Sequence, residues 1–316
     1  MAIQTKFPQD RGLTARMLTT VFLLGLLYAI FITALVLAHV ALGVIIVIGA
    51  VILFVQYFYS DRIALYSMGG KIVTPEQQPQ LHAIVDRLCA MANMPKPRVA
   101  IAQSDIPNAF ATGRNQKNAV VCVTTGLLRR LNEPEVEAVL SHELSHVAHR
   151  DVVVMTVASF LGILAGLLTR MFLFAGLFGG FGGRGRRGGF GGQGGGGGQV
   201  ALIELGVILF SAIIYAISFI LIRTLSRYRE LAADRSGAIL IGQPALLAQA
   251  LVKVSGEMSR IPTQDLRAAE HFNAFFFAPA IAPGASLSSL FATHPPLQKR
   301  LDQLAKLDAE MHRAAS

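Results

Sequence analysis

Charged residues and cysteines are scarce in this chain of 316 residues. Charged residues make up 15% of the sequence and hydrophobic residues 53%, whereas an average soluble domain carries about 25% charged residues. The only two cysteines, Cys89 and Cys122, lie far apart in apolar surroundings, and neither belongs to a C-x-x-C pair. We therefore expect two buried free thiols in a reducing compartment, and not a disulfide or a cysteine metal site. The low charge predicts a protein that lies partly in lipid.

Acidic residues are also few. The 19 acids stand against 28 lysines and arginines, which gives a net charge of +9. A basic balance can indicate nucleic-acid binding, but the chain has no motif of that kind, and basic flanks of membrane spans explain the charge more simply. The phosphate-binding pattern G-x-x-x-x-G-K-[ST] is absent as well. The sequence therefore predicts a lipid bilayer as a partner, no nucleic acid and no ATPase motor.

Four long apolar runs are present, at residues 18–38, 40–59, 152–178 and 200–222. Each is long enough to cross about 30 Å of hydrocarbon as a helix. The first run exceeds the apolar core of a signal peptide, about 7–15 residues, and another run follows it directly, so we expect an uncleaved anchor. Residues 179–199 contain 14 glycines and form a low-complexity loop between the last two runs. The pattern predicts two membrane hairpins.

Basic residues flank the first hairpin on one side. Arg16 precedes it, and Arg62 and Lys71 follow it, so the positive-inside rule places the N-terminus and the segment from residue 61 onward in the cytoplasm. The second hairpin fits this rule less well, because four arginines between residues 170 and 187 would then face the far side; two full spans are favoured over a re-entrant hairpin. The predicted division is a basic segment 1–17, a hairpin 18–59, a first catalytic part 60–151, a second hairpin 152–222 and a second catalytic part 223–316.

A metal-binding pattern lies between the two hairpins. His142, Glu143 and His146 form H-E-x-x-H in an apolar run opened by Glu133 and Pro134, which are helix-start signals. Residues four apart on a helix lie about 40° apart around the axis, so the two imidazoles can point at one ion, with the glutamate between them as a general base. A charged turn of a surface helix is the alternative, and the apolar neighbours argue against it.

The predicted third ligand follows the last apolar run. Glu230 and Asp234 lie four apart and so share a helix face; Glu230 would complete the metal site, and Asp234 would accept the free N–H of a ligand histidine. His149 is a weaker candidate, because reaching the same ion from an unbroken helix is strained. The histidines and Glu230 must reach the same ion, so the chain between them crosses the bilayer an even number of times or not at all. The alternative for both acids is salt bridges to Arg227, Arg229 or Arg235.

Two further segments are candidates for the substrate cleft. Residues 107–113 read as an edge strand beside the metal-binding helix, and a peptide added to such an edge is held by its main chain. A plain structural strand is an equal alternative. His294 precedes two prolines and so sits in a rigid turn, where it can donate to an oxyanion or simply pack. If the segment is such an edge, its substrate-binding residues are Asn108, Ala109, Phe110 and Ala111.

Taken together, these motifs resemble the HtpX family of membrane zinc endopeptidases, which is related to the CAAX prenyl endopeptidases and to mitochondrial inner-membrane stress proteases. The resemblance covers most of the chain. It rests on H-E-x-x-H, on E-x-x-x-D at Glu230 and Asp234, on N-A-x-x-x-G at residues 108–113, and on H-P-x-x-x-x-R from His294 to Arg300. His149 and the Gly/Arg-rich loop depart from the family pattern.

The resemblance implies one zinc ion per subunit, held by His142, His146 and Glu230, with Glu143 as the catalytic base. It also implies polypeptide substrates, mainly damaged membrane proteins, and a place in the bacterial inner membrane; a homo-oligomer is left open. The expected fold is mainly α with a small β-sheet, a multi-pass protein with four apolar spans and a zincin-like cytoplasmic catalytic domain. The expected activity is ATP-independent proteolytic quality control; the alternatives are a prenyl-peptide endopeptidase and a non-catalytic zinc-dependent scaffold.

Overall fold

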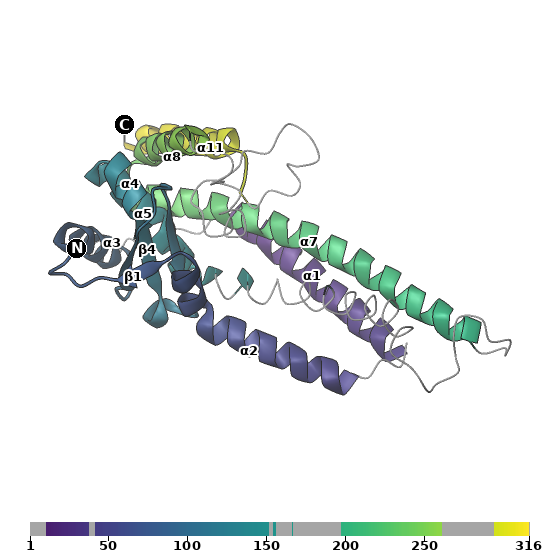
Figure 1. Ribbon diagram of the computed structural model, residues 1–316. Coiled ribbons are helices and arrows are strands. Elements are labelled where there is room, and N and C mark those ends of the chain that lie inside the picture. The colour runs from purple at the N-terminus through teal and green to yellow at the C-terminus, as the bar shows by residue number, and fades with distance from the viewer. Residues whose placement is uncertain are drawn as a thin grey trace. The chain divides into compact units, whose positions relative to one another are not determined.

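The computed structural model separates the chain into two compact units, each described here by itself (Figure 1). The sheet-containing unit comprises residues 1–18, 55–155 and 223–316, and the apolar unit comprises residues 19–54 and 156–222. The structure describes residues 11–37, 42–151, 154–155, 166, 197–260 and 294–315.

A four-stranded mixed sheet lies in the first unit, in the order β1-β2-β4-β3. β2 and β4 are parallel, and the outer strands β1 and β3 each pair antiparallel with an inner neighbour. β4 is buried along its whole length, as expected of an inner strand rich in valine. β3 pairs with β4 alone among the described strands, so it lies at one edge of the sheet. The strands are β1 Gly70–Ile72, β2 Arg98–Ala102, β3 Ala109–Thr112 and β4 Val120–Thr124.

Helices pack against this sheet around one hydrophobic core. Leu88 of α3, Leu140 of α5 and Leu251 of α8 are fully buried there and belong to the same cluster. α5 contacts α3, α8 and the edge strand β3, so it lies centrally in the unit. The helices are α3 Pro79–Ala92, α4 Thr125–Arg130, α5 Glu133–Ala148, α8 Pro244–Arg260 and α11 Leu297–Ala315, with a short 3₁₀ turn, η1, at Gln116–Asn118.

The limits of α5 follow from its sequence. Asn132 accepts a hydrogen bond from the backbone N–H of Glu135, and the Glu135 carboxylate accepts one from the backbone N–H of Asn132. This reciprocal capping box satisfies two of the free donors at the start of a helix. At the other end, His149 is the C-cap and Arg150 has a φ of 57°, in the left-handed region. The helix therefore ends in a sharp turn just after the H-E-x-x-H pattern.

Three long apolar helices supply the second unit and extend into the first: α1 Arg11–Leu37, α2 Leu42–Ser67 and α7 Gly197–Ile241. In the described part of the chain, two stretches are long and apolar enough to cross a membrane, Thr14–Ala34 and Ile208–Ile241. Large apolar side chains such as Phe22 and Leu209 are more than half exposed on them, as expected for surfaces that face lipid. Most of the predicted third run and of the glycine-rich loop lies outside the described residues.

Candidate metal centre

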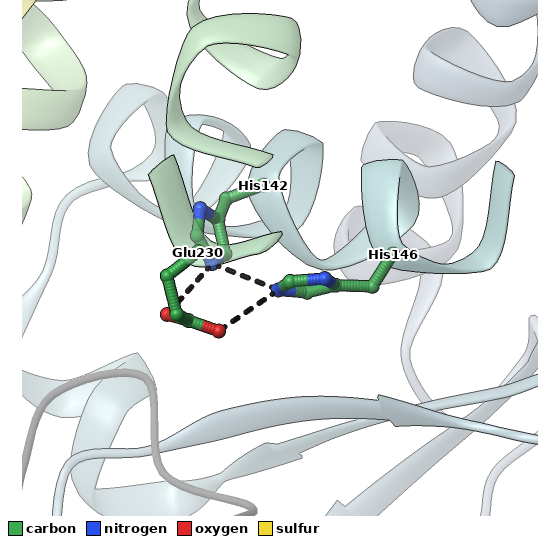
Figure 2. Close-up of side chains that lie close together, drawn as sticks. All are labelled: His142, His146 and Glu230. Atoms are coloured by element: carbon green, nitrogen blue, oxygen red, sulfur yellow. Dashed lines mark hydrogen bonds and ion pairs between the residues drawn. The ribbon is translucent and has the colours of Figure 1, made fainter. Parts of the chain in front are cut away.

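Two imidazoles and one carboxylate converge between α5 and α7 (Figure 2). The Nε2 atoms of His142 and His146 lie 3.2 Å apart. Glu230 places Oε1 3.3 Å from Nε2 of His146 and Oε2 3.7 Å from Nε2 of His142. Two atoms that each lie about 2.0–2.1 Å from a tetrahedral ion are about 3.4 Å apart, so these three residues could hold a zinc ion.

Two of these side chains, those of His142 and Glu230, are buried, and that of His146 is partly buried. His142 is 1% exposed and Glu230 9%, and the imidazole rings of His142 and His146 lie edge to face with centroids 4.8 Å apart. Burial lowers the pKa of His142, which favours the neutral imidazole. Neutral imidazole and carboxylate are the protonation states in which these groups bind a metal, so the environment of His142 suits that role.

A glycine allows α5 and α7 to approach at this point. A Cβ atom at Gly237 would lie 2.8 Å from the backbone nitrogen of His142 and 3.0 Å from its Cα. Both contacts are with backbone, so no side chain can turn aside to relieve them. Gly237 therefore sets how closely the helix that carries Glu230 approaches the helix that carries the histidines.

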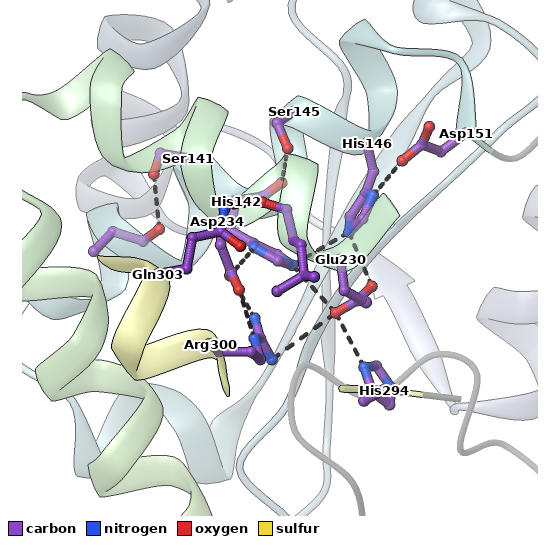
Figure 3. A network of polar contacts seen from close by, with 12 residues as sticks. Ser141, His142, Ser145, His146, Asp151, Glu230, Asp234, His294, Arg300 and Gln303 are labelled. Carbon is purple, nitrogen blue, oxygen red and sulfur yellow. Dashed lines mark hydrogen bonds and ion pairs between the residues drawn. The ribbon is translucent and has the colours of Figure 1, made fainter. Parts of the chain in front are cut away.

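The other ring nitrogen of His142 faces a buried ion pair (Figure 3). Asp234 places Oδ1 2.9 Å from Nδ1 of His142. Arg300 of α11 donates two hydrogen bonds to Asp234, from Nε at 2.7 Å and from Nη2 at 2.6 Å, and it is 1% exposed. The alternative prediction for Glu230 and Asp234 was a pair of salt bridges to arginines of the same helix. The structure instead pairs Asp234 with Arg300, which lies 66 residues further along the chain.

His146 has a matching partner that the sequence did not reveal. Asp151 places Oδ2 2.5 Å from Nδ1 of His146. Its other oxygen lies 3.0 Å from Nε of Arg229, and both side chains are buried. The one sequence signal for this contact is the position of Asp151, which lies five residues after His146 and directly before an apolar run.

Glu143 lies between the histidine pair and the edge of the sheet. Its Oε2 accepts a hydrogen bond of 2.9 Å from the backbone N–H of Ala111 in β3. Burial raises the pKa of Glu143 to about 8. Of the four predicted substrate-binding residues, Asn108, Ala109 and Phe110 are buried and Ala111 is partly exposed. The backbone N–H of Asn108 donates to Oγ1 of Thr124, so its main chain helps to hold β3 in place.

The other two candidate histidines, His294 and His149, occupy different places. Nδ1 of His294 lies 3.0 Å from Oε2 of Glu230, and His294 is buried. It therefore faces the carboxylate of the predicted metal ligand, and its proposed contact with an oxyanion stays a prediction. His149 caps the end of α5, and the group with metal-binding geometry in the described residues consists of His142, His146 and Glu230.

A His-His-Glu cluster with a glutamate beside it, in a chain that also carries helices long and apolar enough to span a bilayer, defines a membrane metallopeptidase. Comparison with known sequences supports this class. The chain belongs to peptidase family M48, whose sequence profile matches residues 75–308. It is therefore a membrane metallopeptidase of the same kind as its HtpX relatives.

Those relatives match nearly the whole chain. Protease HtpX homolog 1 of Streptomyces coelicolor is 54% identical over 312 residues, which cover 99% of this chain and 98% of that protein. Protease HtpX homolog of Moorella thermoacetica is 52% identical over 303 residues, 96% of each chain. The crystal structure of S. mikatae Ste24p has a similar fold, with a TM-score of 0.51, 18% identity, and coverage of 93% of this chain and 67% of that one.

Proposed function

We propose that the protein is a zinc-dependent endopeptidase in which His142, His146 and Glu230 hold the ion and Glu143 is the general base. The observation that carries the proposal is the convergence of these groups. The two Nε2 atoms lie 3.2 Å apart, and the Glu230 carboxylate places one oxygen 3.3 Å from His146 and the other 3.7 Å from His142, close to the separation of about 3.4 Å between two ligands of a tetrahedral zinc ion. Two neutral nitrogens and one carboxylate also match the ligand preference of zinc. Three protein ligands leave a fourth position open, as in catalytic zinc sites.

When bound, zinc would polarise a peptide carbonyl and lower the pKa of a water molecule towards neutrality. Glu143 accepts a proton from the attacking water as the new C–O bond forms at the scissile carbonyl, and then delivers that proton to the leaving amine as the C–N bond breaks. Burial raises its pKa above the usual carboxyl range, the direction that suits a group that must both take and return a proton near neutral pH. Asp234 and Asp151 hold the two imidazoles in orientation.

The outer edge of β3, with which no described strand pairs, supplies the proposed substrate groove. A peptide that pairs with this edge would be held through its main chain, whatever its sequence. Ala111 donates its backbone N–H to Glu143, so this edge lies within hydrogen-bond reach of the proposed base. Main-chain recognition of this kind requires an extended substrate, and without a nucleotide-binding motif the enzyme acts on chains that are already unfolded or loosely folded.

Damaged membrane proteins are the proposed natural substrates, hydrolysed in a stress response without ATP. The proposed topology has four spans, with both catalytic segments, 60–151 and 223–316, in the cytoplasm of a bacterium and the spans in its inner membrane. The flanking charges of Arg16, Arg62 and Lys71 support this orientation. The first and last of the proposed spans overlap the apolar stretches Thr14–Ala34 and Ile208–Ile241.

The test compares three variants of the detergent-purified protein with the wild type by zinc content and casein cleavage. Glu143→Gln should keep one zinc ion and lose cleavage by about 10²–10⁴-fold, the usual contribution of a general base. Glu230→Ala should lose both zinc and cleavage. Glu137→Gln, which changes a glutamate of α5 that is hydrogen-bonded to Arg87, serves as the matched control and should behave as wild type.

Two results contradict the proposal. Wild-type protein that binds no zinc rules out the metal assignment, and Glu143→Gln that cleaves at the wild-type rate rules out the base. A zinc-dependent scaffold is distinguished by Glu143→Gln that keeps its full cellular phenotype. Cleavage of a farnesylated peptide in preference to an unfolded membrane protein in liposomes would replace the proposed substrate class with a prenylated one.

A further inference from the structure

We propose that Asp151 is a positioning residue for His146 and that Arg229 fixes Asp151 in turn. The inference rests on the proposed zinc site. On this inference a carboxylate–arginine pair lies behind each imidazole of the metal centre. The pair behind His146 is Asp151 and Arg229, and the pair behind His142 is Asp234 and Arg300.

The geometry behind the two imidazoles is closely similar. Asp151 lies 2.5 Å from Nδ1 of His146, and Asp234 lies 2.9 Å from Nδ1 of His142. In both histidines Nε2 is the atom directed at Glu230. A carboxylate that accepts the Nδ1 proton fixes the tautomer, turns the Nε2 lone pair towards the ion and makes the imidazole a stronger donor.

An arginine completes each pair. Arg229 places Nε 3.0 Å from Asp151, as Arg300 does at 2.7 Å from Asp234. Asp151 is 2% exposed and Arg229 7%, so neither charge is compensated by bulk water. The Asp151 carboxylate thus lies between an imidazole nitrogen at one oxygen and a guanidinium nitrogen at the other. Asp151 is therefore the acceptor that His146 requires.

The backbone is bent to put Asp151 there. Had α5 continued as a regular helix, residue 151 would lie about 140° around the axis from His146 and about 7.5 Å along it, too far for the side chains to meet as they do. Instead, Arg150 adopts a φ of 57°, a left-handed conformation that is disfavoured for a residue with a Cβ atom. A left-handed residue at this position is a common end of a helix, and here it turns the chain so that Asp151 reaches His146.

The arrangement also ties the two metal-binding helices together at a second point. Asp151 follows the C-cap of α5, and Arg229 precedes Glu230 on α7. The ion pair between them therefore fixes the position of His146 relative to the carboxylate ligand. Loss of this pair should loosen one imidazole and leave the other, held by Asp234 and Arg300, unchanged.

The test measures zinc affinity by chelator competition and records the visible absorption spectrum of the cobalt(II)-substituted protein. Asp151→Asn, which keeps the volume and removes the charge, should weaken zinc binding by about 10–100-fold, the usual effect of removing such a partner, and should shift the cobalt bands. Arg229→Gln should weaken zinc binding less, and the double variant should lose less than the product of the single losses, because the two residues act through one contact.

Glu135→Gln is the matched control, a buried carboxylate at the opposite end of the same helix that is hydrogen-bonded to backbone and paired with Lys253. It should lower the melting temperature and leave zinc affinity and the cobalt spectrum as in wild type. If Asp151→Asn does not fold, Arg229→Lys keeps the charge, changes the donor geometry and should weaken zinc binding several-fold.

The outcomes separate this inference from the proposed function. Asp151→Asn with wild-type zinc affinity and an unshifted cobalt spectrum overturns the inference and leaves the zinc site in place. Equal losses of zinc affinity in Asp151→Asn and Glu135→Gln also overturn it, because the effect would then be one of general stability. Wild-type protein without bound zinc overturns the proposed function itself.

Discussion

Replacing Gly237 with alanine should separate the two helices that carry the proposed ligands. The added Cβ atom would lie 2.8 Å from the backbone nitrogen of His142. Ordinary van der Waals contact begins at 3.4 Å, so the helices would have to move apart by about 0.6 Å. Metal–ligand distances tolerate only about 0.2 Å, and Glu230 lies on the helix that is displaced. We therefore expect Gly237→Ala to fold and to bind zinc poorly.

The size of the effect follows from the strain. Overpacking a close contact costs about 1–3 kcal/mol. The metal-free protein relieves this strain by letting the helices separate, and zinc binding imposes it again when the ligands are drawn together. Since 1.4 kcal/mol is a factor of ten in an equilibrium constant, zinc affinity should fall by roughly 10–100-fold.

Gly256→Ala provides the control. Gly256 lies within the helix α8, and a Cβ atom there would have nothing within 4 Å. Alanine in the interior of a helix is more favourable than glycine by about 1 kcal/mol, so this variant should be at least as stable as wild type and bind zinc equally well. Zinc affinity from chelator competition and melting temperature from circular dichroism in detergent measure both effects. Gly237→Ala with wild-type zinc affinity would refute the reasoning that this close approach sets the ligand geometry.

Three further predictions concern the thiols, the histidines and the start of α5. Burial raises the pKa of Cys89 to about 11 and that of Cys122 to about 12, so both stay protonated at pH 8; iodoacetamide should modify neither in the native protein and both after denaturation, by mass spectrometry. Although burial opposes protonation of His146, Asp151 and Glu230 raise its pKa to about 10 in the metal-free protein. A proton is therefore bound below that pH and must leave when zinc binds, so zinc affinity should rise by about tenfold per pH unit from 6 to 8; an affinity independent of pH in chelator competition would contradict this. Asn132→Ala removes half of the capping box and should lower the free energy of unfolding by about 1 kcal/mol without changing zinc affinity, and an unchanged melting temperature would count against it.

Local spacing made much of the site predictable. His142 and His146 are four residues apart in a strongly apolar helix, and Glu230 and Asp234 repeat that interval, so periodicity alone placed each pair on one face. The requirement that both pairs reach one ion then joined segments more than 80 residues apart. The structure brings the two histidines and Glu230 together as expected. The roles assigned to them remain predictions that the variants above test.

Asp151 could not be predicted from the sequence, and the reason is physical. Its contact with His146 depends on the left-handed turn at Arg150. Glycine and asparagine are the residues that signal such a turn, and arginine does not. Arg229 was considered only as a partner for acids on its own helix, whereas its partner comes from another helix and depends on tertiary packing.

The strand order could not be predicted either, because it also depends on tertiary packing. The residue types at Arg98–Ala102 and at residues 119–123 predict two short strands, and the structure has β2 and β4 there. That these two strands are parallel neighbours, with β3 on the outside, depends on which partners bury them. Pairing of this kind is decided by the whole core, and a single sequence contains no local signal for it.

The parts of the metal centre are spread along the chain from Ala111 in β3 to Arg300 in α11. During translation the two histidines are added less than halfway through the sequence. On the proposed assignment, the carboxylate ligand Glu230 follows more than 80 residues later, and Arg300 follows another 70 residues after that. On that assignment a nascent chain would be unable to cut itself or the chains emerging beside it. Translation that stops early would leave a fragment with the H-E-x-x-H residues and no hydrolytic activity.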